Sequence, residues 1–239
     1  RPHEAIRWYD EVPESDERWF AAGMRIVVLA DAEGDLATSR ARLADLRAMS
    51  GADAERAVDL YLLEAELLAR KSRKADAMAV YVRGLEQFPA DPRLLYAKAM
   101  LAIDLDDIAA AESDLRRIIA DDADSAEALN ALGYTLADRT DRIDEALALV
   151  SRALELKPDE ASIIDSYGWV HFRLGHVDVA VRELRRAHAK APDAEIAAHL
   201  GEALWASGAR DEARDVWEKA RKNDPDNPVL LETIRRLAS

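Results

Sequence analysis

The stretch DSYGWVHFRLGHVDVAVREL, residues 165–184, predicts a pair of helices joined by a short turn. Its apolar residues recur at helical spacing up to Leu174, Gly175 interrupts the pattern, and a second amphipathic run follows. Glycine tolerates the left-handed backbone that ends many helices, so Gly175 predicts a tight turn between two helices. Gly168 lies inside the first helix, where glycine is less favourable than alanine by about 1 kcal/mol. It therefore indicates a point where the two helices cross closely.

The same features recur along the chain with a period of 33 to 35 residues. The series are Pro158, Pro192 and Pro225; Ala146, Ala180 and Ala213; Ala153, Ala187 and Ala220; and Gly133, Gly168 and Gly201. Separate series that agree on one period predict an array of helix–turn–helix units, in which each unit buries its apolar face against the next.

Composition supports a folded, all-helical chain. The 239 residues are 49% hydrophobic, which is too apolar for a disordered protein, and helix-forming residues dominate. A formal net charge of −14 argues against nucleic acid and anionic membrane surfaces as partners. The longest apolar run, residues 26–30, is far shorter than the roughly 20 residues of a membrane-spanning helix. The absence of cysteine excludes disulfides but leaves the compartment open.

The sequence contains no clear catalytic or metal-binding motif. His171 and His176 are five residues apart across the Gly175 turn and lack the spacing of a helical zinc motif. Ser166, His171 and Asp165 contain the residue types of a catalytic triad, but adjacent helix positions point in different directions. The acidic run at 121–127 is typical of helix caps and lacks the glycine of a calcium loop. We expect no enzyme activity, no cofactor and no metal.

The period and its residues resemble the tetratricopeptide repeat, a family of stacked helix–turn–helix units. The resemblance is carried best by Leu132, Gly133, Ala146, Ala153 and Pro158; by Tyr167, Gly168, Ala180, Leu184, Ala187 and Pro192; and by Leu200, Gly201, Ala213, Trp217, Ala220 and Pro225. It implies an all-α fold, a right-handed α-solenoid forming one domain over residues 1–239. The expected parts are a partial repeat at 1–12, full repeats at 20–52, 58–91, 92–125, 126–160, 161–193 and 194–227, and a capping helix at 228–239. One extra residue within 136–146 predicts a longer turn in the fifth of these parts.

The resemblance also implies where the chain binds its partners, because the first helix of each pair lines the concave surface in this family. The groove lining carried over to this sequence is Tyr96, Met100, Asn130, Tyr134, Asp165, Trp169, Phe172, Arg173, Glu202 and Trp205. Aromatic and methionine anchors with a polar rim are typical of binding surfaces. The alternative is that individual rings only pack against neighbouring repeats. The excess of acids predicts partner segments with apolar and basic residues rather than acidic carboxyl-terminal tails.

A narrower resemblance covers residues 128–175 and 197–220. They are similar to the C-terminal part of large proteobacterial tetratricopeptide lipoproteins, a group that includes the binding partner of a periplasmic carboxyl-terminal processing protease. The similarity implies an adaptor that brings this protease to substrates such as peptidoglycan hydrolases. The parent protein would be longer, anchored to the outer membrane and facing the periplasm. The alternatives are a scaffold of another envelope or cytoplasmic assembly system and an accessory domain of an enzyme. We expect a monomer or a weak dimer, with no membrane contact by these residues.

Overall fold

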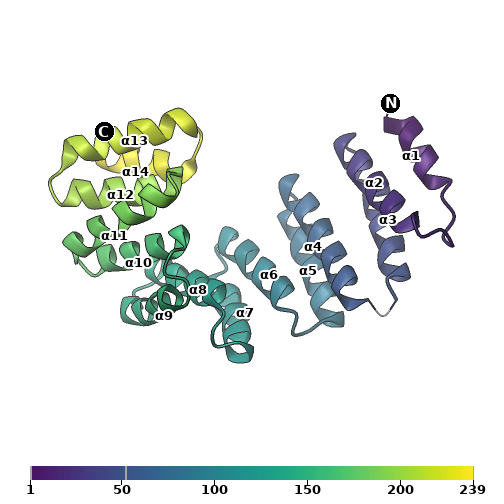
Figure 1. The fold of residues 1–239 in the computed structure, drawn as a ribbon, viewed down its shortest axis with the longest axis horizontal. Coiled ribbons are helices and arrows are strands. Elements are labelled where there is room, and N and C mark those ends of the chain that lie inside the picture. The colour runs from purple at the N-terminus through teal and green to yellow at the C-terminus, as the bar shows by residue number, and fades with distance from the viewer. Residues whose placement is uncertain (1, 52, 239) are drawn as a thin grey trace. The chain divides into compact units, whose positions relative to one another are not determined.

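The computed structural model describes residues 2–51 and 53–238, which form helices joined by short turns (Figure 1). The helices are α1 Pro2–Asp10, α2 Trp19–Ala32, α3 Leu36–Met49, α4 Ala54–Arg70, α5 Lys74–Gln87, α6 Pro92–Asp104, α7 Ile108–Asp121, α8 Ala126–Arg139, α9 Ile143–Leu156, α10 Ala161–Arg173, α11 Val177–Lys190, α12 Ala194–Ala206, α13 Arg210–Asn223 and α14 Pro228–Ala238. The all-α class and the array of helix pairs expected from the sequence are confirmed.

The chain divides into two compact units, Arg1–Leu105 and Asp106–Ser239. The boundary lies in the turn between α6 and α7, inside the repeat that the sequence places at 92–125. One continuous domain over 1–239 therefore stays a prediction.

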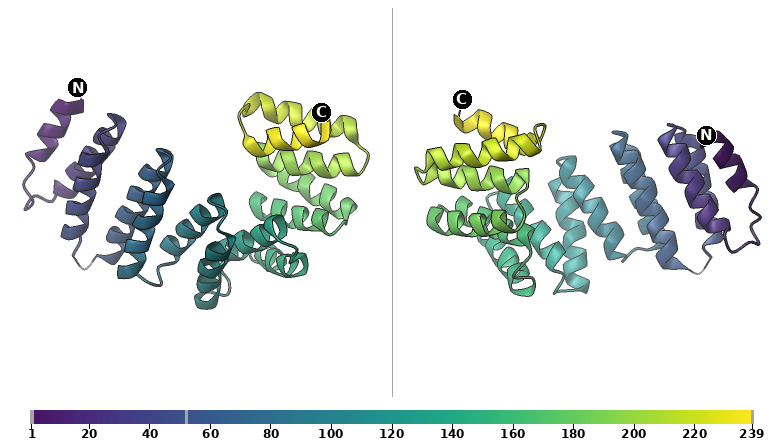
Figure 2. Two further views of the ribbon diagram at one scale, coloured as in Figure 1. Left: turned by 180° about the vertical axis from the view of Figure 1, so that it is seen from behind. Right: turned by 45° about the horizontal axis from the view of Figure 1, so that its top comes forward.

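Helices that follow each other pack as hairpins within each unit. In the first unit α2 packs on α3 and α4 on α5; in the second, α8 packs on α9, α10 on α11 and α12 on α13. The views in Figure 2 show these antiparallel pairs side by side. The lone helix α1 packs on α2, and α14 packs on both α12 and α13. They lie within the ranges 1–12 and 228–239, for which the sequence predicts a partial repeat and a capping helix; that division of the chain stays a prediction.

Gly175 and Gly168 have the roles that the sequence predicts. Gly175 follows the end of α10 with φ of +80°, a backbone angle that side chains disfavour. A Cβ atom on Gly168 would lie 2.8 Å from Leu184 Cγ and 3.2 Å from the Leu184 backbone nitrogen. Only glycine therefore allows α10 and α11 to approach this closely.

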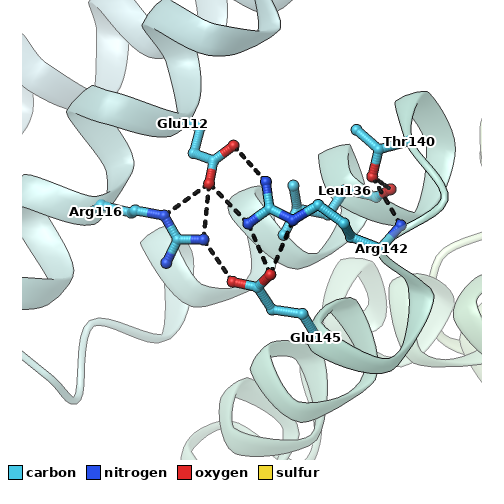
Figure 3. Close-up of polar contacts among 6 residues, drawn as sticks. All are labelled: Glu112, Arg116, Leu136, Thr140, Arg142 and Glu145. Atoms are coloured by element: carbon cyan, nitrogen blue, oxygen red, sulfur yellow. Dashed lines mark hydrogen bonds and ion pairs between the residues drawn. The ribbon is translucent and has the colours of Figure 1, made fainter.

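The prediction of a longer turn within 136–146 is wrong. The turn between α8 and α9 has the same length as the turn between α10 and α11, and the extra residue extends α8 by one position. No left-handed residue ends this helix. Thr140 is extended, donates its hydroxyl to the Leu136 carbonyl at 2.6 Å and accepts the Arg142 amide at 3.1 Å (Figure 3). The threonine hydroxyl thus satisfies backbone groups at the helix end.

An ion-pair network joins the second helices of two repeats in the second unit (Figure 3). The Arg142 guanidinium at the start of α9 donates to Glu112 on α7 at 2.8 Å and to Glu145 at 2.7 Å. Arg116 on α7 donates to Glu112 at 2.7 Å. The hydrogen bond from Arg142, reinforced by Arg116, lowers the pKa of Glu112. The network lies on the exposed side of the helices.

The first unit contains a buried carboxylate of a different kind. Glu64 on α4 is 2% exposed and pairs with Arg40 at 2.9 Å and Arg47 at 2.8 Å, both on α3. The guanidinium of Arg83 on α5 lies 3.5 Å from the Glu64 carboxylate. The arginines supply the counter-charge that a buried carboxylate requires. Glu64 thus links α4 to α3 and α5, the second helices of two adjacent pairs.

Candidate protein-binding surface

The first helices of successive repeats lie beside one another in the second unit. There α10 packs against both α8 and α12, so residues one repeat apart along the chain come into contact. Tyr134, Trp169 and Glu202 occupy equivalent positions on these three helices. The α8–α10–α12 surface is formed by Tyr134 on α8, by Asp165, Trp169 and Phe172 on α10, and by Glu195 and His199 on α12.

A buried ion pair lies at the centre of this surface. His199 on α12 is 3% exposed, and its Nδ1 lies 2.9 Å from an oxygen of Asp165 on α10. Burial disfavours the charged imidazole ring, but the Asp165 carboxylate, together with Glu195 and Asp138, outweighs it and raises the pKa of His199. The surrounding carboxylates thus favour the imidazolium form.

Tyr134 extends this pair towards the solvent. In the imidazolium both ring nitrogens donate, so His199 Nε2 donates to the Tyr134 hydroxyl at 3.4 Å. The hydroxyl in turn donates to Glu195 at 3.3 Å. Burial and the charges of Glu195, Asp138 and Asp165 raise the pKa of Tyr134, so the phenol keeps its proton. A chain of hydrogen bonds therefore runs from buried Asp165 to exposed Glu195 across three helices.

Trp169 and Phe172 form an aromatic stack over the ion pair. The Trp169 ring lies 4.3 Å from the His199 ring and 5.2 Å from Phe172, centroid to centroid, and both pairs are stacked. Trp169 is 7% exposed, and its indole nitrogen is buried without a hydrogen-bond partner among the described residues. An indole ring stabilises an adjacent cation through its π face. Trp169 therefore supports the imidazolium, while Phe172 keeps part of its ring at the surface.

Two charged residues of the predicted groove are engaged within the unit. Arg173 donates to the backbone carbonyls of Ala137 and Asp138, the latter at 3.3 Å, at the last turn of α8. A cation at this end of a helix interacts favourably with the helix dipole. Glu202 is 9% exposed and pairs with Arg236 of α14 at 2.6 Å. Arg173 thus joins α10 to α8, and Glu202 joins α12 to α14.

Trp205 lies on α12 beside the second helix of its own repeat. Its ring stacks on Trp217 of α13 at 5.7 Å, and the guanidinium groups of Arg210 and Arg214 both lie 5.1 Å from its centroid. The cations screen the face of this ring from water. Trp169 and Trp205 therefore both pack against other side chains of the protein. This agrees with the alternative that individual groove rings pack within the array.

The remaining residues of the predicted groove lie apart from this cluster. Tyr96 and Met100 are half-buried on α6 in the first unit. Asn130 is half-buried on α8, and its side-chain oxygen is buried without a hydrogen-bond partner in the described chain. A single stripe running through all the predicted residues stays a prediction, because Tyr96 and Met100 belong to a different unit.

Sequence reasoning missed His199 as part of this surface. His199 follows Asp165 by one repeat period of 34 residues. That spacing is a usable signal, because equivalent positions of adjacent first helices meet. Asp138 was also missed, since its influence depends on the way α8, α10 and α12 come together.

The residues considered for catalysis are used otherwise. The Ser166 hydroxyl donates to the Ser162 carbonyl at 3.0 Å, and His171 Nδ1 faces His176 Nδ1 at 3.1 Å. Asp165 pairs with His199 instead of with His171. Among residues 2–51 and 53–238, no three histidine or acidic side chains are grouped to hold a metal ion. No helix in that part of the chain is long and apolar enough to span a bilayer.

The helix pairs, and the packing of their first helices against one another, define a helical-repeat protein. The sequence model of the tetratricopeptide repeat matches residues 96–161 and 168–228. The chain belongs to the tetratricopeptide repeat family, as the residue pattern predicts.

Known relatives agree with this assignment. The TPR repeat-containing protein PA4667 of Pseudomonas aeruginosa is 49% identical over 146 residues, which cover 61% of this chain and 25% of that protein. The chain thus spans about a quarter of the length of this curated relative. The structure of TTC0263, a thermophilic TPR protein from Thermus thermophilus, matches with a TM-score of 0.65 and 24% identity over 76% of this chain and 97% of that one. A tetratricopeptide repeat protein from Parabacteroides merdae matches with a TM-score of 0.72 and 15% identity over 91% and 85%. The two structures establish the fold.

Proposed function

We propose that this chain is a non-catalytic adaptor whose α8–α10–α12 surface binds segments of partner proteins. The proposal rests on the chain of hydrogen bonds that runs from Asp165 through His199 and Tyr134 to Glu195. The Trp169 ring stacks on the His199 ring of this chain. Buried polar networks that are fully connected fix side chains rigidly. A rigid set of aromatic rings and carboxylates next to solvent is suited to binding, since few rotamers are lost on association.

The charges of the surface indicate which segments it binds. Asp138 and Glu195 lie near the Tyr134 hydroxyl, while Arg173 and Arg236 are occupied by partners within the unit. Partner segments with basic and apolar residues complement this arrangement, and acidic tails are repelled by it. The proposed occupant of the surface is therefore an extended basic segment.

The proposed partners are a periplasmic carboxyl-terminal processing protease and its protein substrates, among them peptidoglycan hydrolases. This part of the proposal rests on the similarity of residues 128–175 and 197–220 to tetratricopeptide lipoproteins that bind such a protease. In that setting the chain faces the periplasm as part of an outer-membrane lipoprotein. A scaffold for another assembly system is the second candidate and makes no use of this protease.

Direct binding measurements test both the proposed surface and the proposed partners. Purified chain is titrated with catalytically inert processing protease and, separately, with an inert peptidoglycan hydrolase. The Tyr134→Phe, Glu195→Gln variant keeps the rings but removes the polar tip of the network, and we expect it to weaken binding by about tenfold. The matched control is Asp215→Asn, which removes an exposed carboxylate on α13.

The outcomes distinguish an error in the proposed surface from an error in the proposed partners. Binding that weakens only in the Tyr134→Phe, Glu195→Gln variant supports the surface and identifies the partner that uses it. Equal binding of a partner by the parent chain and both variants rules out this surface as the binding site, while still supporting an adaptor function. Absence of binding to both proteins contradicts the protease assignment and favours a scaffold of another system.

A further inference from the structure

A cavity of about 310 Å³ opens between α2 and α4 in the first unit. Phe20 and Met24, one helical turn apart on α2, line one wall, and Asp59 and Leu60 of α4 line the other. Its volume is near the lower end of the range for small-molecule sites. The cavity is therefore large enough for an apolar side chain of a partner.

The wall of this cavity is apolar but only partly covered. Phe20 and Met24 are half-buried, while Leu60 is buried at 1% exposure. The guanidinium of Arg56, one turn into α4, lies 4.5 Å from the centroid of the Phe20 ring. This cation covers one face of the ring and leaves the cavity open beside it. An apolar side chain entering the cavity would contact Phe20 and Met24.

The rim of the cavity is acidic. Asp53 caps α4 by accepting the Arg56 amide at 3.0 Å, and Asp59 pairs with Arg93 at 2.8 Å. Glu55 is exposed and makes no hydrogen bond or ion pair within residues 2–51 and 53–238. Arg56, the cation at the rim, is already close to Asp53 at 3.5 Å. The rim therefore retains negative charge that a partner cation can neutralise.

We propose that this cavity is a second docking site, which takes an apolar side chain of an extended partner segment and places a neighbouring lysine or arginine against Glu55 and Asp59. The inference rests on the proposed adaptor function, but it uses residues of the first unit alone. The apolar wall provides the anchor, and the acidic rim selects segments in which basic residues flank that anchor. The occupant is a stretch of another protein, since the site combines an open cavity with exposed charges at its edge.

Defined peptides test this specificity on the whole 239-residue chain. The probe is a short fluorescent peptide of alternating leucine and lysine, compared with peptides of alternating leucine and glutamate and of alternating serine and lysine. We expect the leucine–lysine peptide to bind at least about tenfold more tightly than either comparison peptide. Its binding should shift the backbone amide resonances of Phe20, Met24 and Arg56.

Variants assign the binding to the cavity. Met24→Ser removes part of the apolar wall, and Glu55→Gln with Asp59→Asn removes rim charge. Each should weaken the leucine–lysine peptide by about tenfold. The matched control, Glu86→Gln with Asp215→Asn, removes two exposed carboxylates elsewhere and should change nothing.

The results distinguish this site from the α8–α10–α12 surface. A loss of affinity confined to the cavity variants supports the second docking site. Loss only in Tyr134→Phe, Glu195→Gln overturns the cavity proposal and leaves the adaptor surface standing. Equal binding of the leucine–glutamate peptide, or no binding of the leucine–lysine peptide, also overturns the cavity proposal, while protease binding still decides the proposed function.

Discussion

Glu64 in the first unit and Asp165 in the second are both buried carboxylates, but they are paired on opposite sides of the repeat. In the first unit Glu64 pairs with arginines of α3 and α5, which are second helices. In the second unit Asp165 of α10 pairs with His199 of α12, and both are first helices. Arginine keeps its charge at every ordinary pH, whereas histidine changes charge near neutrality. A permanent ion pair thus secures the first unit, and a titratable one lies at the proposed binding surface of the second.

The helix pairs also differ in how tightly they cross. In α12 a Cβ on Gly201 would lie 2.0 Å from the indole nitrogen of Trp217, a rigid ring that is 2% exposed. In α2 a Cβ on Gly23 would meet a methyl carbon of Leu46 at 2.7 Å, which is the end of a flexible side chain. The crossing of α12 and α13 therefore tolerates less change than the crossing of α2 and α3.

The largest expected effect tests the permanent pair. Glu64→Gln leaves Arg47, whose side chain is 14% exposed, without its buried counter-charge, and should lower the free energy of unfolding of the first unit by about 3 kcal/mol. Urea unfolding measures the loss, and amide hydrogen exchange in α4 locates it. Glu66→Gln on the same helix is the control, because Glu66 is exposed and approaches Arg70 only to 3.9 Å. Equal effects of the two changes would show that the cluster around Glu64 contributes nothing special.

The second prediction sharpens the contrast between helix crossings. Gly201→Ala should destabilise the second unit by about 2 kcal/mol or more, because the Trp217 ring must move to admit the new methyl group. Gly23→Ala should cost less, since Leu46 can change rotamer. Thermal unfolding of the two variants and the parent chain compares them directly. A larger loss for Gly23→Ala would contradict the difference in packing tightness.

The sequence predicts the repeats well because their signals are local and periodic. Gly168 indicates a helix crossing and Gly175 a turn, and the structure confirms both. The residues of the two alanine series are buried. The turn at 140–142 was mispredicted because a threonine hydroxyl can end a helix without a left-handed residue. The position of one extra residue depends on such a local choice, which periodicity alone does not reveal.

The candidate site was less predictable because it depends on contacts between repeats. The resemblance named Asp165 and Trp169 as groove residues, but their burial follows from His199, which lies one repeat away. The cavity beside Phe20 depends on the point at which α4 begins, and Ala54 starts this helix one turn before the predicted repeat at 58–91. Such features arise where two elements meet, and single-repeat patterns carry no information about them.

The third prediction uses pH to separate the two buried pairs. The pKa of His199 is raised in the folded protein, so its charged form stabilises the second unit fully below the unfolded value of about 6.5. This stabilisation is lost as the pH rises through the higher folded-state pKa. The difference in urea midpoint between the parent chain and His199→Gln should therefore shrink as the pH increases from about 6.5. The partners of Glu64 are arginines, which keep their charge. The difference in urea midpoint between the parent chain and Glu64→Gln should therefore stay constant over the same pH range.

The smallest expected effect concerns the exposed network of Glu112, Arg116, Arg142 and Glu145 (Figure 3). Although its hydrogen bonds are as short as those of the buried pairs, water and salt screen exposed charges, so each contact contributes little to stability. Glu112→Gln should shift the urea midpoint less than any change above, and added salt should remove the shift. Because burial protects Glu64 from the same screening, its variant should keep most of its effect in salt. A salt-resistant loss for Glu112→Gln would mean that α7 and α9 depend on this network as strongly as α4 depends on its buried pair.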